Sequence, residues 1–324
     1  MIHSRLENPF DWLEQIARQT GGCINDNILT IDTSVLKGYI RRFPVEEGFT
    51  MTVTDLLAFE DIPFYQQAMA SDYLLLKLYL PNFQFNTTAG EGLDILDIHL
   101  PGILASNSRM EAFSVIRKGK PFKMLALTMS ADWLQQHHQD GIFLLNKSLL
   151  EKPVMLFEQA SPALLQHALN FFAGMNSKYL NFEAKTTAYD ILSKVLPLFD
   201  HRQASSFKPV KNQHDGDLLL QVRNRLVAGL EDRCPTIEKL SQEFGMSPTK
   251  LKTLFHSVFG LPIYQYFLRE RLAYAKRLIE SRTCNVSEAG FRVGYNNLSK
   301  FSAAFKKEFG FMPKEILQSD WSNQ

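Results

Sequence analysis

The sequence contains 324 residues, 45% of them hydrophobic and 21% charged, and its formal net charge is +1. These values are ordinary for globular proteins, and the length predicts about two domains. No uninterrupted apolar stretch reaches the ~18–20 residues that a membrane helix needs, so we expect no membrane partner. The first residues, MIHSRLENPFDW, lack the basic start and apolar run of a signal peptide, and none is expected.

The cysteines and the charge distribution narrow the possibilities further. Cys23, Cys234 and Cys284 match no zinc-binding spacing and give a poor disulfide framework, which predicts reduced thiols and a cytoplasmic location. Residues 217–324 contain 16 Lys and Arg against 11 Asp and Glu, whereas residues 1–216 contain 19 against 23. A basic C-terminal third on a mildly acidic body indicates a module that binds a polyanion.

Short strands are expected over residues 28–128, after an amphipathic helix over Pro9–Gln19. The strands are runs of partly alternating apolar and polar residues, separated by Gly, Pro, Asn and Asp. The runs are ILTIDTSVLKGYIRRF, GFTMTVTDLLAF, DYLLLKLYL, LDILDIHL, MEAFSVI and FKMLALTM. Strands at such close spacing predict a small antiparallel β-barrel or sandwich, similar to a cupin, with flanking helices.

From Ser130 the hydrophobic period becomes helical. Ser130 is expected to cap one helix, and Ser161 with Pro162 to begin a second. A third helix is expected over 181–196, and Pro197 would end or kink it. Its apolar stripe consists of Ala184, Ala188, Ile191, Leu192 and Val195.

The next segment predicts a domain boundary. Residues 201–216, HRQASSFKPVKNQHDG, are polar and have no periodicity, which is typical of a linker. An N-terminal domain is therefore expected over residues 1–200, strand-rich over 28–128 and helical over 130–200. A second, all-α domain is expected over residues 217–324, so the predicted fold class is α+β.

Two segments of the C-terminal third resemble each other: EKLSQEFGMSPTKLKTLFHSVFGLP and SEAGFRVGYNNLSKFSAAFKKEFGFMP. Gly245 aligns with Gly294, 49 residues later. Four more positions align at a spacing of 50 residues: Leu251, Phe255, Phe259 and Gly260 with Phe301, Phe305, Phe309 and Gly310. The change in spacing places one extra residue in the second turn, and duplication over this many positions indicates a repeated structural unit.

The first copy has the pattern helix, turn, helix. Thr236 is expected to cap a helix that ends before Gly245, where the left-handed conformation is accessible to glycine. Ser247 caps the next helix, with Pro248 in its first turn. A compact glycine turn between two short helices is typical of the helix-turn-helix motif, whose second helix enters the major groove of DNA.

The second copy repeats the pattern with different caps. Asn285 and Glu288 have the spacing of a capping box, Gly294 forms the turn, and Asn296 or Asn297 begins the next helix. Between the copies, residues 264–280 predict one helix about 25 Å long at 1.5 Å per residue. Such a helix could hold two recognition helices about one DNA turn (~34 Å) apart, in two adjacent major grooves.

The C-terminal part resembles the AraC/XylS family of bacterial transcription regulators. The matching stretches are TIEKLSQEFGMSPTKLKTLFHSVFG, LRERLAYAKRLIE and VSEAGFRVGYNNLSKFSAAFKKEFGFMPKEI, and the segment GYIRRFPVEEGFTMTVTDLLAFED is similar to the pyochelin-regulator-like branch. The resemblance implies double-stranded promoter DNA as a partner, a small-molecule effector of siderophore-like type, and RNA polymerase if the protein is an activator. It also implies a homodimer, in which the stripe from Ala184 to Val195 packs partly against the second subunit.

The resemblance places DNA contacts on the outward faces of both recognition helices. The first helix would use Thr249, Lys250, Lys252, Thr253 and His256. The second would use Asn296, Asn297, Ser299, Lys300, Ser302 and Ala303, while Lys306 and Lys307 lie either on a solvated face or against phosphates. Many family members carry Arg, the commonest reader of guanine, at Thr253 and Ala303. The second helix is therefore expected to position the protein more than it discriminates between bases.

No catalytic residues, cofactors or metal ligands are expected. The chain contains no nucleophile–base pair, phosphate-binding glycine loop or HExxH motif, and among the strands only His99 could bind a metal. The leading hypothesis is therefore an effector-responsive transcription regulator that acts as an activator. The alternatives are a ligand-independent DNA-binding regulator and a barrel enzyme with an attached DNA-binding module.

Overall fold

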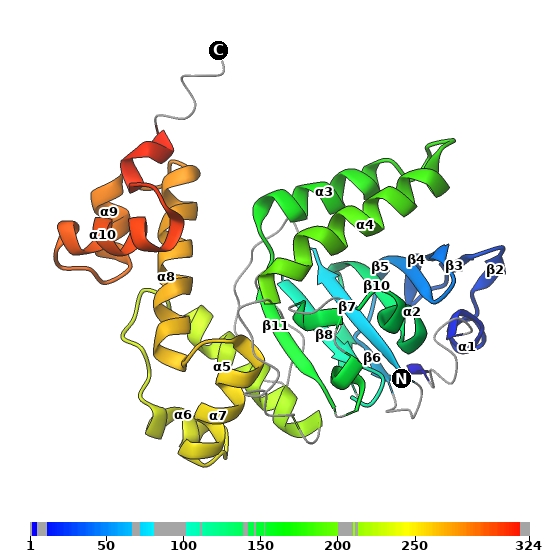
Figure 1. Ribbon diagram of the computed structural model, residues 1–324, viewed down its shortest axis with the longest axis horizontal. Helices are drawn as coiled ribbons and strands as arrows, with labels where there is room; N and C mark the ends of the chain where they lie inside the picture. Colours follow the sequence, from blue (N-terminus) through cyan, green and yellow to red (C-terminus); the bar gives the residue numbers. More distant parts are fainter. Residues whose placement is uncertain are drawn as a thin grey trace. The chain divides into compact units, whose positions relative to one another are not determined.

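An antiparallel sheet of eight strands dominates the N-terminal part of the structure, a computed structural model (Figure 1). The structure describes residues 2–4, 12–66, 72–80, 102–110, 112–138, 142–145, 147–151, 153–199, 210 and 213–317. The strand order is β11-β8-β7-β10-β5-β4-β3-β2. The strands are β2 (Cys23–Asn25), β3 (Ile28–Asp32), β4 (Leu36–Glu46), β5 (Phe49–Ala58), β7 (Tyr73–Tyr79), β8 (Gly102–Asn107), β10 (Pro121–Ser130) and β11 (Met155–Gln159).

A second, smaller sheet has the order β1-β6-β9, with β1 parallel to β6 and β6 antiparallel to β9. Its strands are β1 (Ile2–Ser4), β6 (Ile62–Gln66) and β9 (Ala112–Ile116). The strand-rich region is antiparallel in all but the β1–β6 pair and one isolated bridge, which agrees with the prediction. The predicted run LDILDIHL and the start of the first predicted helix at Pro9 lie outside the described residues.

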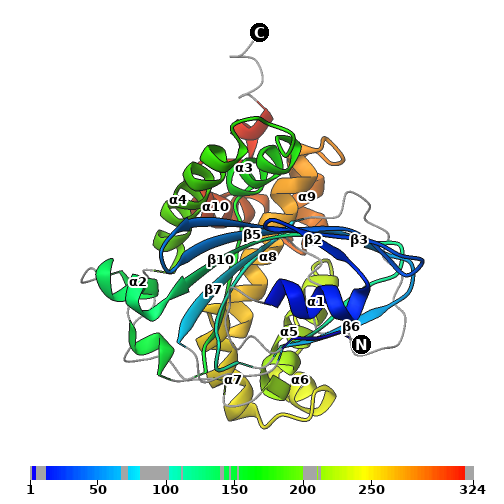
Figure 2. The same ribbon diagram turned by 90° about the vertical axis from the view of Figure 1, so that its right-hand side faces the viewer.

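Helices cover both faces of the large sheet. Figure 2 shows α3 (Pro162–Ala173) and α4 (Leu180–Phe199) on one face and α1 (Trp12–Thr20) on the other. The short α2 (Ala131–Gln136) follows β10 directly, and the 3₁₀ turns Phe143–Leu145 and Lys147–Leu150 follow it. Both predicted caps are present, because Ser130 accepts from the N–H of Trp133 and Ser161 from that of Leu164.

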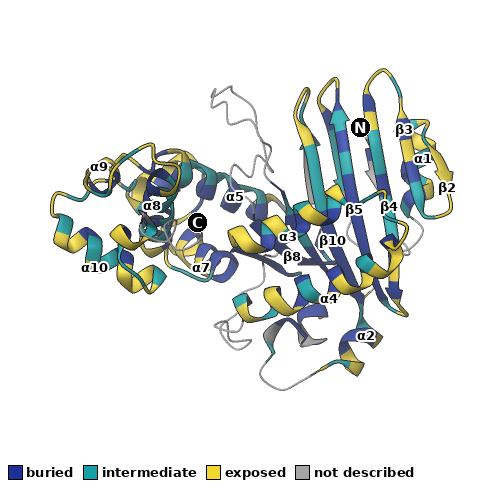
Figure 3. Cartoon of the chain, turned by 90° about the horizontal axis from the view of Figure 1, so that it is seen from above, coloured by how far each residue is buried: buried dark blue, intermediate teal, exposed yellow. Residues whose placement is uncertain are grey.

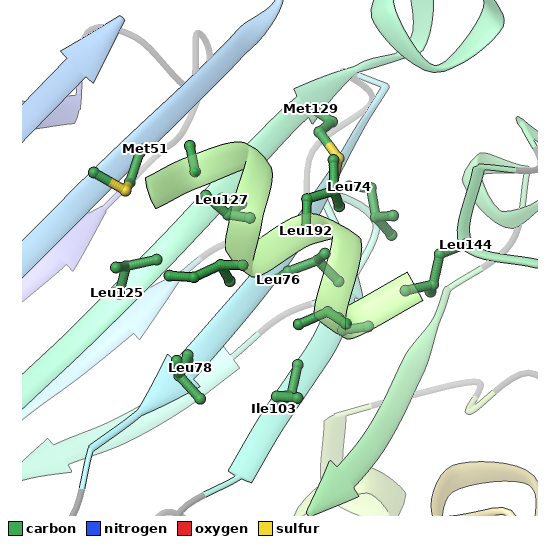
Figure 4. Close-up of a cluster of buried hydrophobic side chains, with 14 of the residues drawn as sticks. Met51, Leu74, Leu76, Leu78, Ile103, Leu125, Leu127, Met129, Leu144 and Leu192 are labelled. Carbon is green, nitrogen blue, oxygen red and sulfur yellow. The ribbon is translucent and has the colours of Figure 1, made fainter. Parts of the chain in front are cut away.

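The alternation of side chains gives the large sheet one strongly apolar face. Met51, Leu76, Leu125 and Leu127 project from neighbouring strands toward α4, where Leu192 packs on them (Figure 4). Burial of this many aliphatic side chains supplies the main stabilisation of the N-terminal unit, at about 1.5–3 kcal/mol for each fully buried side chain.

One expectation for residues 130–200 is wrong, because the region is not helical throughout. It contains a strand, β11, which pairs with β8 through Leu156 and Ala105. The first four residues of β11 are all buried, so the strand lacks the alternation by which a sequence reveals one. Pro197 does not end α4, which continues to Phe199, because a proline in the last turn removes only one helical hydrogen bond.

The stripe on α4 is intramolecular core. Ala184, Ala188, Ile191, Leu192 and Val195 are at most 4% exposed and belong to the cluster beneath the helix. The stripe therefore leaves no apolar surface for a second subunit. Helix α4 has exposed as well as buried positions along its length (Figure 3). The aromatic side chains that α4 and the preceding turn expose are Tyr179, Phe182 and Tyr189, which lie outside the stripe.

The C-terminal part is helical. After α5 (Gln213–Ala228) come α6 (Ile237–Glu243), α7 (Pro248–Phe259), α8 (Ile263–Glu280), α9 (Val286–Arg292), α10 (Leu298–Phe309) and a 3₁₀ turn, Pro313–Leu317. The chain divides into two compact units, Met1–Gln221 with Ser257–Gly260, and Val222–His256 with Leu261–Gln324. The first four residues of α5 belong to the segment predicted as a linker. The α+β fold class, a sheet-rich N-terminal region followed by a helical domain, is confirmed.

Replacing Ile191 with Lys should unfold the N-terminal unit and not merely separate subunits. The change places an unpaired charge in a site that is 2% exposed, so we expect the free energy of unfolding to fall by roughly 4 kcal/mol or more. Thermal unfolding followed by circular dichroism measures the loss. Ser193→Lys, on the exposed side of the same helix, is the matched control and should change stability by less than about 0.5 kcal/mol. Equal stability of the two variants would contradict this assignment of the core.

Candidate nucleic-acid interface

The first helix-turn-helix is built as its caps predict. The Thr236 hydroxyl accepts from the N–H of Lys239 at 3.2 Å and begins α6. Gly245 follows the helix with a φ of +64°, in a position with open space around its Cα. Ser247 then caps α7 by accepting from the N–H of Lys250 at 3.4 Å. The turn therefore reverses the chain at a residue that tolerates the left-handed conformation.

Helix α7 has one buried and one polar face. Leu251, Phe255 and Val258 are fully buried, and Leu254 is nearly so. The residues predicted to contact DNA from this helix are all exposed: Thr249, Lys250, Lys252, Thr253 and His256. The structure therefore places the five on the surface together, on the helix that follows the turn.

The second helix-turn-helix begins with the predicted capping box. The Asn285 side chain accepts from the N–H of Glu288, and the Glu288 carboxylate accepts from the N–H of Asn285, both at 2.9 Å. Gly294 has a φ of +84°. Asn297, not Asn296, caps α10 by accepting from the N–H of Lys300. Two residues lie between Gly294 and its cap Asn297, whereas one lies between Gly245 and Ser247, which locates the extra residue of the repeat.

Helix α10 has the same division into faces. Phe301 and Phe305 are fully buried, and the rings of Phe305 and Phe309 lie 4.6 Å apart, so these aromatics form core. Seven of the eight predicted contact residues are exposed, and Ser302 is half-buried at the edge of the core. The exposed seven are Asn296, Asn297, Ser299, Lys300, Ala303, Lys306 and Lys307.

Helix α8 joins the two motifs and contributes to both cores. Its 18 residues span about 27 Å at 1.5 Å per residue. Near its start, Tyr266 packs edge-on against Phe255 of α7, with ring centroids 5.4 Å apart. Toward its end, Ala275 and Ile279 are buried with Phe301 and Phe305 of α10. Each half of α8 is thus part of a different helix-turn-helix.

Polar contacts that the sequence did not reveal connect the turn after α5 with α8 and α9. The Glu231 carboxylate accepts from the Tyr274 hydroxyl at 2.8 Å and from Nε of Arg292 at 2.6 Å. Arg271 donates from Nε to the Leu230 carbonyl at 2.8 Å and from Nη2 to the Asp232 carbonyl. We call this group of contacts the Glu231–Arg271 clamp. Its members are far apart in sequence, so only the fold brings them together.

The contacts of the clamp lower the pKa of Glu231. Burial raises the pKa of this carboxyl, but the hydrogen bonds from Tyr274 and Arg292 outweigh it and hold the pKa below its usual value. The carboxylate therefore stays charged at neutral pH. Each charge-assisted hydrogen bond to it holds α8 and α9 against the turn that begins at Gly229.

Comparison with known proteins agrees with this geometry. A helix-turn-helix domain profile matches residues 240–319, which include both motifs and α8. The HTH-type transcriptional regulator ExsA of Pseudomonas aeruginosa is 24% identical over 264 residues, 74% of this chain and 90% of that protein. The HTH-type transcriptional activator RhaS of Escherichia fergusonii is 32% identical over 98 residues, 29% of this chain and 35% of that protein. Residues 240–319 form a helix-turn-helix domain of the AraC type, and the relatives that this chain resembles are transcriptional regulators.

Two solved structures are also similar to parts of this chain. A probable AraC family transcriptional regulator from Rhodopseudomonas palustris is 28% identical and covers 32% of this chain and 96% of its own, with a TM-score of 0.29. ToxT from Vibrio cholerae is 15% identical and covers 84% of this chain and 98% of its own, with a TM-score of 0.32.

The described residues include no group of three or more His, Cys, Asp or Glu placed to hold a metal ion. Cys23 is exposed, Cys234 and Cys284 are half-buried, and all three are free thiols. No helix within the described ranges is long and apolar enough to span a bilayer. The relatives described above are named as transcriptional regulators.

The two turn glycines should respond differently to alanine. At Gly245 the substitution adds only the strain of a left-handed backbone, about 1 kcal/mol, because no atom lies within 4 Å of the added Cβ. At Gly294 the new Cβ would lie 2.9 Å from Nη1 of Arg271. Displacing that side chain would break its bonds to the Leu230 and Asp232 carbonyls, so we expect a total loss of about 2–3 kcal/mol.

Chemical denaturation of the two variants measures the difference directly. Gly245→Ala serves as the control for backbone strain, since both glycines have a positive φ. A loss at Gly294 no larger than that at Gly245 would show that Arg271 moves at no energetic cost and that the clamp is weak.

Proposed function

We propose that this chain is an effector-responsive activator of the AraC family that contacts two adjacent major grooves of promoter DNA. The observation that carries the proposal is the exposure of polar residues on both α7 and α10, each the second helix of a motif built on α8. Recognition helices in this position enter the major groove. The activator role, RNA polymerase as a partner and a cytoplasmic location follow from family likeness.

The two recognition helices would have different roles in DNA binding. Helix α7 exposes Lys250, Lys252 and His256, whereas the middle of α10 exposes Ser299 and Ala303 with one cation, Lys300. A groove-facing Lys can donate to guanine, and small side chains discriminate little. We therefore assign base discrimination mainly to α7 and positioning mainly to α10. Lys306 and Lys307, in the last turn of α10, would contact phosphates.

The effector would bind the polar face of the large sheet, opposite the face covered by α4. Thr50, Thr52 and Thr54 of β5 project to this face and are buried, and Thr128 of β10 pairs with Thr50. Lys77 of β7 pairs with Ala126 of β10 on one side and with Leu104 of β8 on the other. Burial lowers the pKa of Lys77 to about 8. Buried hydroxyls beside an amine provide the donors and acceptors that orient a small molecule.

Self-association would use the exposed side of α4. Tyr179, Phe182 and Tyr189 are 60%, 78% and 41% exposed, and residues 182 and 189 are two helical turns apart. Exposed aromatic side chains are enriched at protein interfaces. This surface replaces the buried stripe as the proposed contact in a homodimer.

Substitution of single lysines should distinguish the residues that discriminate between bases from those that contact phosphates. Lys252→Ala should weaken specific binding and relax the preference at one base pair by about 1–3 kcal/mol. Lys306→Ala and Lys307→Ala should weaken binding to all sequences alike, and each phosphate interaction removed should lower the salt slope by about one unit. Ala303→Arg should create a preference for guanine in the other half of the site. The measurement is binding to single-base operator variants at several salt concentrations.

A reversed result would overturn this division. If Lys252→Ala shifted all operator variants equally while Lys307→Ala changed base preference, α7 would be the positioning helix. If none of these variants altered DNA affinity, the proposed interface would be wrong as a whole.

The lowered pKa of the half-buried Lys77 predicts a pH dependence of stability. The pKa of Lys77 is about 8 in the folded protein against 10.5 for the free side chain, so the unfolded chain binds more protons between these values. The free energy of unfolding should therefore rise as the pH rises from 8 to 10.5, by less than about 1.4 kcal/mol per pH unit. Thermal unfolding of the wild type against Lys77→Met over this range isolates the contribution. Parallel curves for the two proteins would contradict the burial of a charged lysine at this face.

A further inference from the structure

A cleft of about 490 Å³ opens in the N-terminal unit beside β3, β4 and the first turns of α4. It exists because β3 is shorter than its neighbour. Ile28 at the start of β3 pairs with Arg41, whereas β4 continues to Glu46, so Phe43 and Pro44 lie beyond the last β3–β4 pair. The remaining wall is formed by Asn181 and Lys185, one helical turn apart on α4.

The cleft is rich in positive charge. Arg41, Arg42 and Lys185 line it, against the single carboxylate of Asp26. None of the three cations forms an ion pair with a carboxylate in the part of the chain that the structure describes. The charge of Lys185 also acts on Glu46, but that carboxylate is hydrogen-bonded by Tyr189 and Trp133. The positive charge of the cleft is therefore not neutralised by the fold.

Arg41 and Arg42 project from opposite faces of β4, and each has a defined contact. Arg42 donates from Nε at 3.2 Å and from Nη2 at 3.0 Å to Oδ1 of Asn27, while its Nη1 is shielded from solvent and has no hydrogen-bond partner among the described residues. The Arg41 guanidinium lies 4.9 Å from the centre of the Phe43 ring.

We propose that this cleft binds a small organic carboxylate. Its carboxylate would lie between Arg41 and Lys185, where guanidinium and ammonium groups supply charge-assisted hydrogen bonds, and its apolar part would pack on Phe43 and Ile28. The ligand would join α4 to the unpaired end of β4. The cleft lies at the edge of the sheet that β3 leaves open. Arg41 and Phe43 pair with Val53 and Met51, on the face that α4 covers, so the proposed carboxylate site is on the opposite face from the threonines assigned above to the effector.

Ligand-observed NMR titration of the full chain with benzoate tests the proposal, with benzamide as the neutral analogue of the same shape. We expect saturable binding of benzoate and at least tenfold weaker binding of benzamide. Arg41→Gln and Lys185→Gln should each weaken benzoate binding about tenfold or more. Lys37→Gln is the matched control, since Lys37 lies on the same strand outside the cleft and is paired with Asp32, and it should leave binding unchanged.

The proposal fails if benzoate does not saturate, if benzamide binds equally well, or if Lys37→Gln weakens binding as much as the two cleft variants. Lys185 is exposed on α4, so its replacement keeps the test valid even if Arg41→Gln unfolds the unit. Lys252→Ala should leave the titration unchanged, which separates a failure at the cleft from a failure of the proposed DNA interface.

Discussion

The carboxylate of Glu231 is the point on which the geometry of the DNA-binding unit depends. It accepts hydrogen bonds from Tyr274 in α8 and Arg292 in α9, and Arg271 of α8 holds the carbonyls on either side of it. A helix joining two small motifs would bend or roll if only apolar contacts held it, because apolar contacts are not directional. Charge-assisted hydrogen bonds add direction, so the clamp fixes how α8 and α9 are oriented against the turn after α5.

In the N-terminal unit, the two faces of the large sheet have different roles. One face is aliphatic and is sealed by α4, which supplies stability, while the opposite face is lined with buried hydroxyls and Lys77. Buried polar groups contribute little net stability, and each must find a partner. Their placement on one face of a well-packed sheet is typical of a binding surface supported by a rigid element, which suits a unit that would sense a small molecule.

The helical part was predictable because its signals are local. Thr236, Ser247, Asn285 and Glu288 act on backbone groups within three residues, and Gly294 marks a turn that needs a positive φ. Strand β11 escaped prediction because burial on both sides removes the alternation of its residues. The clamp and the charged cleft could not be predicted from the sequence for a different reason. Glu231 meets Arg292, and Arg41 meets Lys185, only after folding brings together residues that no short-range spacing connects.

The central claim is that α7 and α10 contact DNA as one rigid unit, and the spacing between the two halves of the binding site tests it most directly. Once the binding site is located, affinity would be measured for the full chain on operators lengthened between the halves by about half a helical turn (~5 bp) and a full turn (~10 bp). The account predicts that both insertions weaken binding at least tenfold, since α8 is about 27 Å long and cannot reach a more distant groove. Equal affinity for all three spacings would contradict it, because the two motifs would then move independently.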